Sequence, residues 1–180
     1  MENKGVYFAR KFILAVGVFF LLLILPAVNA EAKEVSLVKG DAIRYMGYST
    51  HYYYVDGNLA FCLEPDMKSP GNGAYSASEL DPKSHLSKAM YYMYGGPGYE
   101  QYIKSSLTGG WGEDANAYCL THCVLSYIYD GCDQNSAAFK GLNADIASAV
   151  VMYADYVKNL PDIPDAELAF SENGLTAYYD

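Results

Sequence analysis

The chain has 180 residues, with 12 Lys and Arg against 21 Asp and Glu, and 52% of its residues are hydrophobic. This length fits one globular domain with a small appended element. The high apolar fraction excludes a disordered chain, and the net charge of −9 argues against a nucleic-acid partner, because phosphates would not be neutralised. The 19 tyrosines indicate an interface or a strand-rich structure, because Tyr is both apolar and hydrogen-bonding.

The first thirty residues are typical of a secretory signal peptide. Three basic residues precede an apolar run over 12–25, which Pro26 ends. The run is shorter than the roughly 20 residues that a membrane span requires, which makes a retained anchor the less favoured alternative. Small residues near the end predict cleavage after Ala30. We therefore expect an exported chain with a mature domain over 31–180 and no membrane contact after cleavage.

The first part of the mature chain is predicted to form strands. Apolar and aromatic residues dominate 31–64, and Asp56-Gly57 lies between two such segments as a two-residue hairpin turn. Pro, Asn and Gly in 66–75 predict a loop.

Three helices are predicted to follow. The first has Asp81 as its N-cap and runs from Pro82 to about Tyr94. The second runs from about Asp114 to Asp130, where Gly131 supplies a left-handed stop. The third runs from about Asn143 to Leu160. Its apolar residues at helical spacing are Ile146, Val150, Tyr153 and Val157.

Strands return near the end, over 166–171 and 175–179, with Asn173-Gly174 as the turn. The order of strands, helices and strands predicts an α+β fold. We expect the N- and C-terminal strands to form a sheet or partial barrel, with an insertion of about three helices packed on it. Because the pattern stops just after a strand, we also expect the chain to be part of a longer protein.

Four cysteines in an exported chain raise the question of disulfides, but the spacing makes most pairings difficult. Cys119 and Cys123 are four residues apart on the second helix, which puts their Cβ atoms about 5–6 Å apart against about 3.8 Å in a disulfide. Cys132 lies beyond the helix stop, so Cys62 is the partner left for one of them. A metal site of Cys119, His122 and Cys123 lacks a known ligand spacing, so we expect no metal and no cofactor.

The second helix has two chemically different faces. Cys119, His122, Cys123, Ser126 and Asp130 lie opposite an apolar face of the same helix. Either this face carries chemistry, or the helix is buried all round and its small polar groups bond to backbone or water.

Cys62 lies at the predicted end of a strand, just before a loop, where reactive groups are often displayed. If Asp56-Gly57 is the turn, His51 lies across from Cys62 on the same face.

Two motifs resemble the thioester domain of Gram-positive surface adhesins. Phe61-Cys62-Leu63-Glu64 is followed about sixty residues later by Thr121-His122-Cys123-Val124, and the segment from Tyr91 to Gly98 is also similar. The resemblance covers about Val35 to Asp130. In that family a strand Cys and a helix Gln condense with loss of ammonia to form an internal thioester, which an amine of a host ligand can attack.

The resemblance implies a secreted, wall-anchored surface protein of the bacterial cell. Its tip domain would attach to a host or extracellular matrix protein, and stalk domains would follow downstream in the same or the parent protein. The chain departs from the family at one position, because His122 stands where the family has Gln. An imidazole has no carboxamide carbon for the Cys62 thiol to attack. The glutamines at 101 and 134 lie away from the motif position, so a cross-link through Gln101 or Gln134 is a minor alternative.

Three hypotheses follow for this variant. In the first, which we favour, the domain is not an enzyme and binds through its tyrosine-rich surface without a Cys–Gln thioester. In the second, it is a thiol enzyme for acyl transfer or thiol exchange, with Cys62 as nucleophile and His122 or His51 as base. Thr121 and Glu64 would then be orienting neighbours. In the third, Cys62 is simply a buried small hydrophobe.

Overall fold

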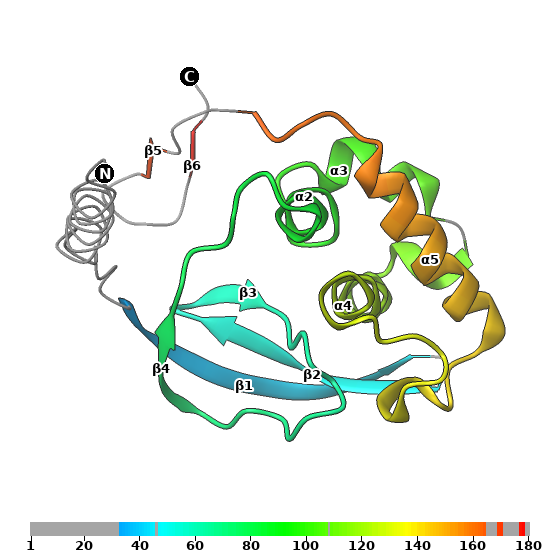
Figure 1. Ribbon diagram of the computed structural model, residues 1–180, viewed down its shortest axis with the longest axis horizontal. Coiled ribbons are helices and arrows are strands. Elements are labelled where there is room, and N and C mark those ends of the chain that lie inside the picture. Colours follow the sequence, from blue (N-terminus) through cyan, green and yellow to red (C-terminus); the bar gives the residue numbers. More distant parts are fainter. Residues whose placement is uncertain (1–32, 46, 108, 165–168, 171–176, 179–180) are drawn as a thin grey trace, which may run out of the picture. The chain divides into compact units, whose positions relative to one another are not determined.

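The computed structural model describes residues 33–45, 47–107, 109–164, 169–170 and 177–178. The predicted signal peptide and its cleavage site lie outside these residues. The main sheet has four antiparallel strands in the order β3-β2-β1-β4 (Figure 1). Its strands are β1 (Lys33–Tyr45), β2 (Tyr48–Val55), β3 (Asn58–Ala60) and β4 (Gly73–Ala77).

The hairpin between β2 and β3 is confirmed. Val55 pairs with Asn58 across the two-residue turn, and Asp56 and Gly57 have φ angles of 49° and 83°. Positive φ at both central residues is the geometry that a tight hairpin turn requires, and Asp-Gly is well suited to it. The predicted loop over 66–75 is wrong at its end, because Gly73 already begins β4, which pairs with β1.

The helical part contains four α-helices and three short 3₁₀ helices in the described part of the chain. The α-helices are α2 (His85–Tyr92), α3 (Tyr99–Tyr102), α4 (Asp114–Asp130) and α5 (Ala144–Lys158). The 3₁₀ helices are η1 (Lys104–Ser106), η2 (Gly109–Gly112) and η3 (Ala137–Phe139).

The predicted second and third helices are confirmed. Gly131 caps α4 in the left-handed region with φ 69°, and its backbone N–H returns to the helix. Asn143 caps α5 by accepting a hydrogen bond from the Asp145 N–H at 2.8 Å. The four apolar residues predicted for its inner face are all buried.

The predicted start of the first helix is wrong. Ser84, not Asp81, is the N-cap of α2, and its hydroxyl accepts a hydrogen bond from the Ser87 N–H at 3.1 Å. Asp81 instead forms a turn before the helix, in which its carbonyl accepts from the Ser87 hydroxyl at 2.6 Å. Two capping residues compete in this segment, and the one nearer the apolar run caps the helix.

The expected joining of N- and C-terminal strands in one sheet is not confirmed. In the described residues, β5 (Ala169–Phe170) and β6 (Ala177–Tyr178) pair with each other as a separate two-stranded sheet. Their register is centred on Asn173-Gly174, the predicted turn, which itself lies outside the described residues. The α+β class is confirmed.

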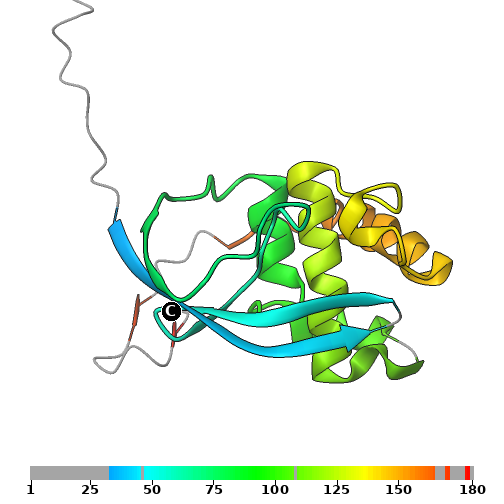
Figure 2. The same ribbon diagram turned by 90° about the horizontal axis from the view of Figure 1, so that it is seen from below.

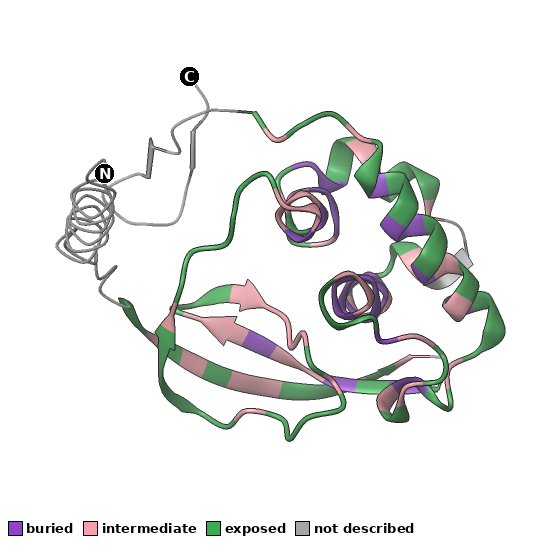
Figure 3. Ribbon diagram, in the orientation of Figure 1, coloured by how far each residue is buried: buried purple, intermediate pink, exposed green. Residues whose placement is uncertain are grey.

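Helix α4 lies at the centre of the fold. Figure 1 shows it between the sheet on one side and α2 and α5 on the other, and Figure 2 shows β1 and β2 crossing in front of it. Ten consecutive residues, Ala117–Ser126, are buried, so the helix is surrounded on all sides (Figure 3). The burial of Cys119, His122, Cys123 and Ser126 agrees with the second of the two interpretations of its faces, whereas Asp130 is exposed.

The chain after α5 is fastened to α2. The Tyr92 hydroxyl donates to the Pro161 carbonyl at 3.0 Å, and the Lys88 ammonium lies 3.2 Å from the Asp162 carboxylate. Lys88 also donates to the Lys158 carbonyl at 3.3 Å.

None of the helices among the described residues combines the length and the apolar character that a membrane span requires.

Candidate functional site around Cys62 and His122

One face of α4 holds the segment that follows β3. Tyr118, His122 and Ser126 are spaced four residues apart and therefore line one side of the helix. The Tyr118 hydroxyl donates to the Ala60 carbonyl at 2.8 Å, and the Ser126 hydroxyl donates to the Cys62 carbonyl at 3.3 Å. His122 lies between these two contacts on the helix, so its ring lies beside the Cys62 backbone.

The His122 ring is deeply buried, with 1% of the residue exposed. Its Nδ1 is 3.0 Å from the Tyr48 hydroxyl, and the two rings meet edge to face with centroids 5.4 Å apart. Its Nε2 is buried without a hydrogen-bond partner. Burial lowers the pKa of His122 to about 4, and the adjacent Cys62 backbone opposes this shift in part. The imidazole is therefore neutral at pH 7.

The Cys62 thiol is half-buried and is not activated. Burial raises its pKa, and the Glu64 backbone N–H, which lies within reach, lowers it only in part. Within the described residues no hydrogen bond joins the thiol to the His122 ring. Thiol and imidazole are both neutral at pH 7, whereas a reactive pair would be a thiolate beside an imidazolium.

Three further predicted residues take other positions. The Thr121 hydroxyl accepts a hydrogen bond from the Tyr94 N–H at 3.2 Å, so it fastens the chain after α2 to α4 rather than orienting Cys62. The Glu64 side chain is exposed, and Glu64 approaches the thiol through its backbone. The pairing of β2 with β3 ends at Tyr53 and Ala60, so the sheet does not continue to a pair of His51 with Cys62.

The pairing of β2 with β3 stops at Tyr53 and Ala60 because of a contact from α4. The Tyr118 hydroxyl is 3.0 Å from the His51 carbonyl as well as 2.8 Å from that of Ala60, and it occupies the place where the ladder would continue. His51 pairs with Ala42 on its other side. The two glutamines at 101 and 134 are exposed, in α3 and after α4, and no hydrogen bond joins Gln101 or Gln134 to Cys62 in the described part of the chain.

The geometry thus brings a strand-end Cys against a central helix, at the helix position one residue after Thr121. The family model described as Thioester domain matches residues 34–164 of the chain. The chain belongs to the thioester-domain family. No curated protein and no solved structure matches it. Membership of this family indicates an adhesin-type domain of the cell surface.

The other three cysteines of this thioester domain are structural. Cys119, Cys123 and Cys132 are free and buried. Burial raises the pKa of Cys119 to about 11 and also raises that of Cys123. The Cys132 thiol donates to the Asp130 carboxylate at 3.5 Å. In the ranges that the structure describes, no three His, Cys, Asp or Glu side chains are grouped to hold a metal ion.

Two residues of the thioester-domain site, Tyr118 and Tyr48, are not among those predicted from the sequence. Tyr118 lies one helical turn before His122, and this spacing could have identified it as a residue of the same face. Tyr48 comes from β2, and no short-range pattern in the sequence joins it to a helix 74 residues later.

Because His122 is buried and neutral, we expect the domain to lose stability in mild acid. Below pH 6.5 the unfolded chain binds a proton at this residue, whereas the folded thioester domain does so only near pH 4. The free energy of unfolding should therefore fall as the pH is lowered from 6.5 to 4, by about 3 kcal/mol, and then show no further contribution from this group. Urea unfolding at a series of pH values measures this.

The matched control is His122→Asn, which is neutral throughout the range. Between pH 6.5 and 5, before most carboxylates titrate, the wild type should lose more stability than this variant. If the free energy of unfolding fell equally with pH in both proteins, the buried imidazole would not be the cause.

Proposed function

We propose that this domain attaches a bacterial cell surface to a host or extracellular matrix protein, and that it does so without a Cys–Gln thioester. The family supports the adhesin-type role. The observation that supports the absence of a thioester is His122, whose ring lies beside the Cys62 backbone and which stands where the resemblance to the family puts the Gln. The thioester reaction needs a carboxamide carbon there, and imidazole has none.

The proposal includes the route to the surface. An N-terminal signal peptide, cleaved after Ala30, would export the chain, and stalk domains downstream would carry the domain away from the cell wall. The net charge of −9 and the 19 tyrosines are consistent with a protein-binding surface rather than a nucleic-acid or lipid one.

The electrostatics support the adhesin over the thiol enzyme. A Cys/His enzyme needs an ionised pair at working pH, which means a lowered thiol pKa and a protonated imidazole. Here burial shifts both groups the other way, with the pKa of Cys62 raised and that of His122 lowered to about 4.

The test has two readouts on the folded mature domain. Its intact mass should equal the mass calculated from sequence, and incubation with methylamine should add nothing. Alkylation of Cys62 by iodoacetamide at pH 7 should be slow, and His122→Ala should not slow it further, because the imidazole does not activate the thiol.

Each alternative gives a different result. A mass lower by one ammonia, with a methylamine adduct, would mean that a thioester forms through a Gln elsewhere in the chain. Fast alkylation of Cys62 that His122→Ala slows would favour the thiol enzyme.

A further inference from the structure

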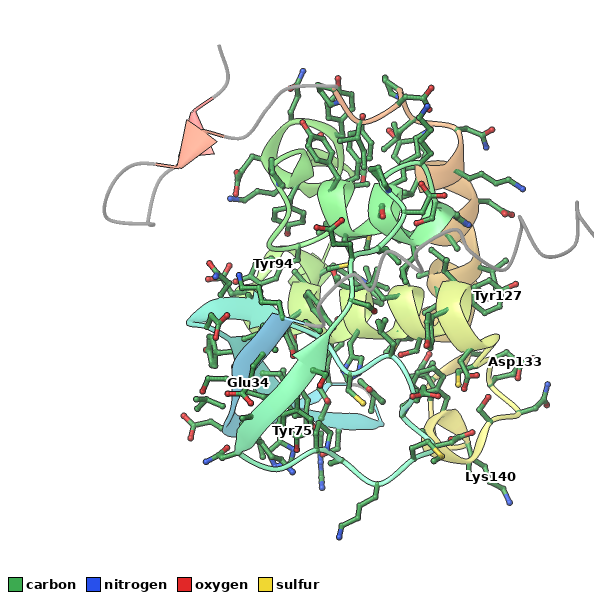
Figure 4. All side chains as sticks on the ribbon, turned by 60° about the vertical axis from the view of Figure 1, so that its left-hand side comes forward. Glu34, Tyr75, Tyr94, Tyr127, Asp133 and Lys140 are labelled. Carbon is green, nitrogen blue, oxygen red and sulfur yellow. The ribbon has the colours of Figure 1, made fainter. Side chains whose placement is uncertain are left out.

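A cavity of about 470 Å³ lies where α4 ends and α5 begins. The last turn of α4, the segment that contains η3 and the first half of α5 form its walls. Figure 4 labels Tyr127 at the end of α4 and Asp133 in the segment that follows, and both residues line the cavity. The α4 side chains that contact the Cys62 segment do not line it, so the cavity is separate from the site described above. Its volume is in the range of ligand sites, roughly 300–1,000 Å³.

The floor of the cavity is apolar and held in place. Phe139 and Val150 line it and are both buried. The Phe139 ring meets the Tyr48 ring edge to face, with centroids 5.1 Å apart. The segment with Phe139 is also tied to a distant part of the chain, because the Ala138 N–H donates to the Asp66 carboxylate at 2.6 Å. The cavity is therefore formed without a ligand and offers aromatic and aliphatic surface to one.

The wall above this floor is negatively charged. Asp133 lines the cavity, and the Cys132 thiol, which also lines it, donates to the Asp130 carboxylate at 3.5 Å. Burial raises the pKa of the Cys132 thiol most, and the charges of Asp130 and Asp66 raise it further. Among the described residues, no ion pair involves any of these three carboxylates. The cavity therefore favours a cationic group over an anionic one.

The Asp133 carboxylate is fixed in position but not neutralised. It accepts hydrogen bonds from the Asn135 N–H at 2.8 Å and from the Asn135 side-chain amide at 3.1 Å. Both donors are uncharged, and a carboxylate has about four lone-pair sites, so acceptor capacity remains for a ligand. Lys140 is the next basic residue along the chain, and Figure 4 shows it away from Asp133.

The mouth of the cavity continues into exposed apolar surface. Val151 lines the cavity and is 41% exposed. Met152 and Tyr156, on the same helix, are exposed as well. Exposed apolar side chains beside a cavity are typical of a protein interface in which one side chain enters a pocket and its surroundings exclude water. This favours a side chain of a protein over a free small molecule.

We propose that this cavity binds an arginine side chain of the protein partner, with the guanidinium beside Asp133 and the aliphatic chain on the apolar floor. The inference rests on the proposed function as an attachment domain and names one group that the domain would recognise. A guanidinium is planar, stacks on aromatic rings, donates to carboxylates and is more weakly hydrated than an ammonium. An uncharged apolar group would leave Asp133 without a counter-charge, and an anion would be repelled.

The test is an NMR titration of the folded mature domain with Nα-acetyl-arginine methylamide. The ring signals of Tyr127 and the methyl signals of Val150 and Val151 should shift and saturate. The citrulline analogue has nearly the same shape without the charge and should bind about ten-fold more weakly. Equal binding of the two compounds, or shifts that do not saturate, would overturn the proposal.

Three variants locate the site. Asp133→Asn keeps an acceptor for Asn135 and removes the charge, so it should weaken binding about five-fold. Ala147→Leu puts a larger side chain at a position that lines the cavity and should abolish saturation. Asp41→Asn is the matched control, because Asp41 is an exposed carboxylate of β1 that does not line the cavity, and it should bind as the wild type does.

Equal affinity of the Asp133 and Asp41 variants, or unchanged binding by Ala147→Leu, would contradict the proposal. The Ala147 variant gives an independent answer if Asp133→Asn perturbs the fold, which the amide spectrum reports.

The two proposals fail separately. A methylamine adduct would contradict the absence of a thioester and leave the arginine titration unaffected. A missing response to the arginine compound, with the intact mass as calculated, would overturn the arginine site alone.

Discussion

His122→Gln is expected to give a domain whose mass is lower by one ammonia. The substitution places a carboxamide at the helix position that lies beside the Cys62 segment. The thiol sulfur then attacks the carboxamide carbon, the C–S bond forms, the C–N bond breaks, and the amide nitrogen leaves as ammonia with the thiol proton. Intact-mass spectrometry measures the loss, and methylamine should reopen the thioester with a corresponding mass increase.

Two variants make this result specific. Cys62→Ala combined with His122→Gln lacks the nucleophile and should keep its full mass. His122→Asn has a carboxamide one methylene shorter and should not reach the sulfur. A folded His122→Gln domain of unchanged mass would mean that the helix does not present this side chain to the thiol, and the explanation for the missing thioester would then have to lie elsewhere than in His122.

Gly96→Ala is expected to destabilise the domain by about 3 kcal/mol. A Cβ at this position would clash with the carbonyl oxygens of both Met90 and Tyr91. These are backbone atoms at the end of α2, and the Tyr91 carbonyl also accepts the Gly98 N–H at 2.9 Å. Relief of the clash therefore requires the end of the helix to open. Urea unfolding of the variant and the wild type measures the difference.

Gly71→Ala is the control for backbone entropy. A Cβ there would meet nothing within 4 Å, so this substitution should change stability little or increase it slightly. If both variants were equally stable, the close approach at Gly96 would be contradicted.

The elements that the sequence predicts well are those with strong local signals. Asp-Gly between aromatic segments identifies the β2–β3 hairpin, and Gly131 after a long apolar run identifies the end of α4. The start of α2 could not be predicted as well, because Asp81 and Ser84 are both good caps and the choice depends on packing. The first residues of β4 contain Gly, which favours a loop in the sequence, because the pairing partner in β1 is not visible locally.

The candidate site divides in the same way. The approach of Cys62 to His122 could be predicted from the two motifs, which specify a strand end and a helix position. The protonation states of the thiol and the imidazole could not be predicted in this way, because they depend on how deeply each group is buried. Tyr48 and Tyr118 close the space around the ring and link it to the strands, and these long-range contacts keep the imidazole neutral.

The fastening of the chain after α5 to α2 has a mechanical consequence. Tension applied at residue 164, as a tether would apply it in flowing liquid, would act first on the Lys88–Asp162 pair and on the bond from Tyr92 to Pro161. Both lead the load into α2, which packs against α5 and α4. Under the proposed attachment role, a pull on a downstream tether would therefore load α2 before the helices that pack on it.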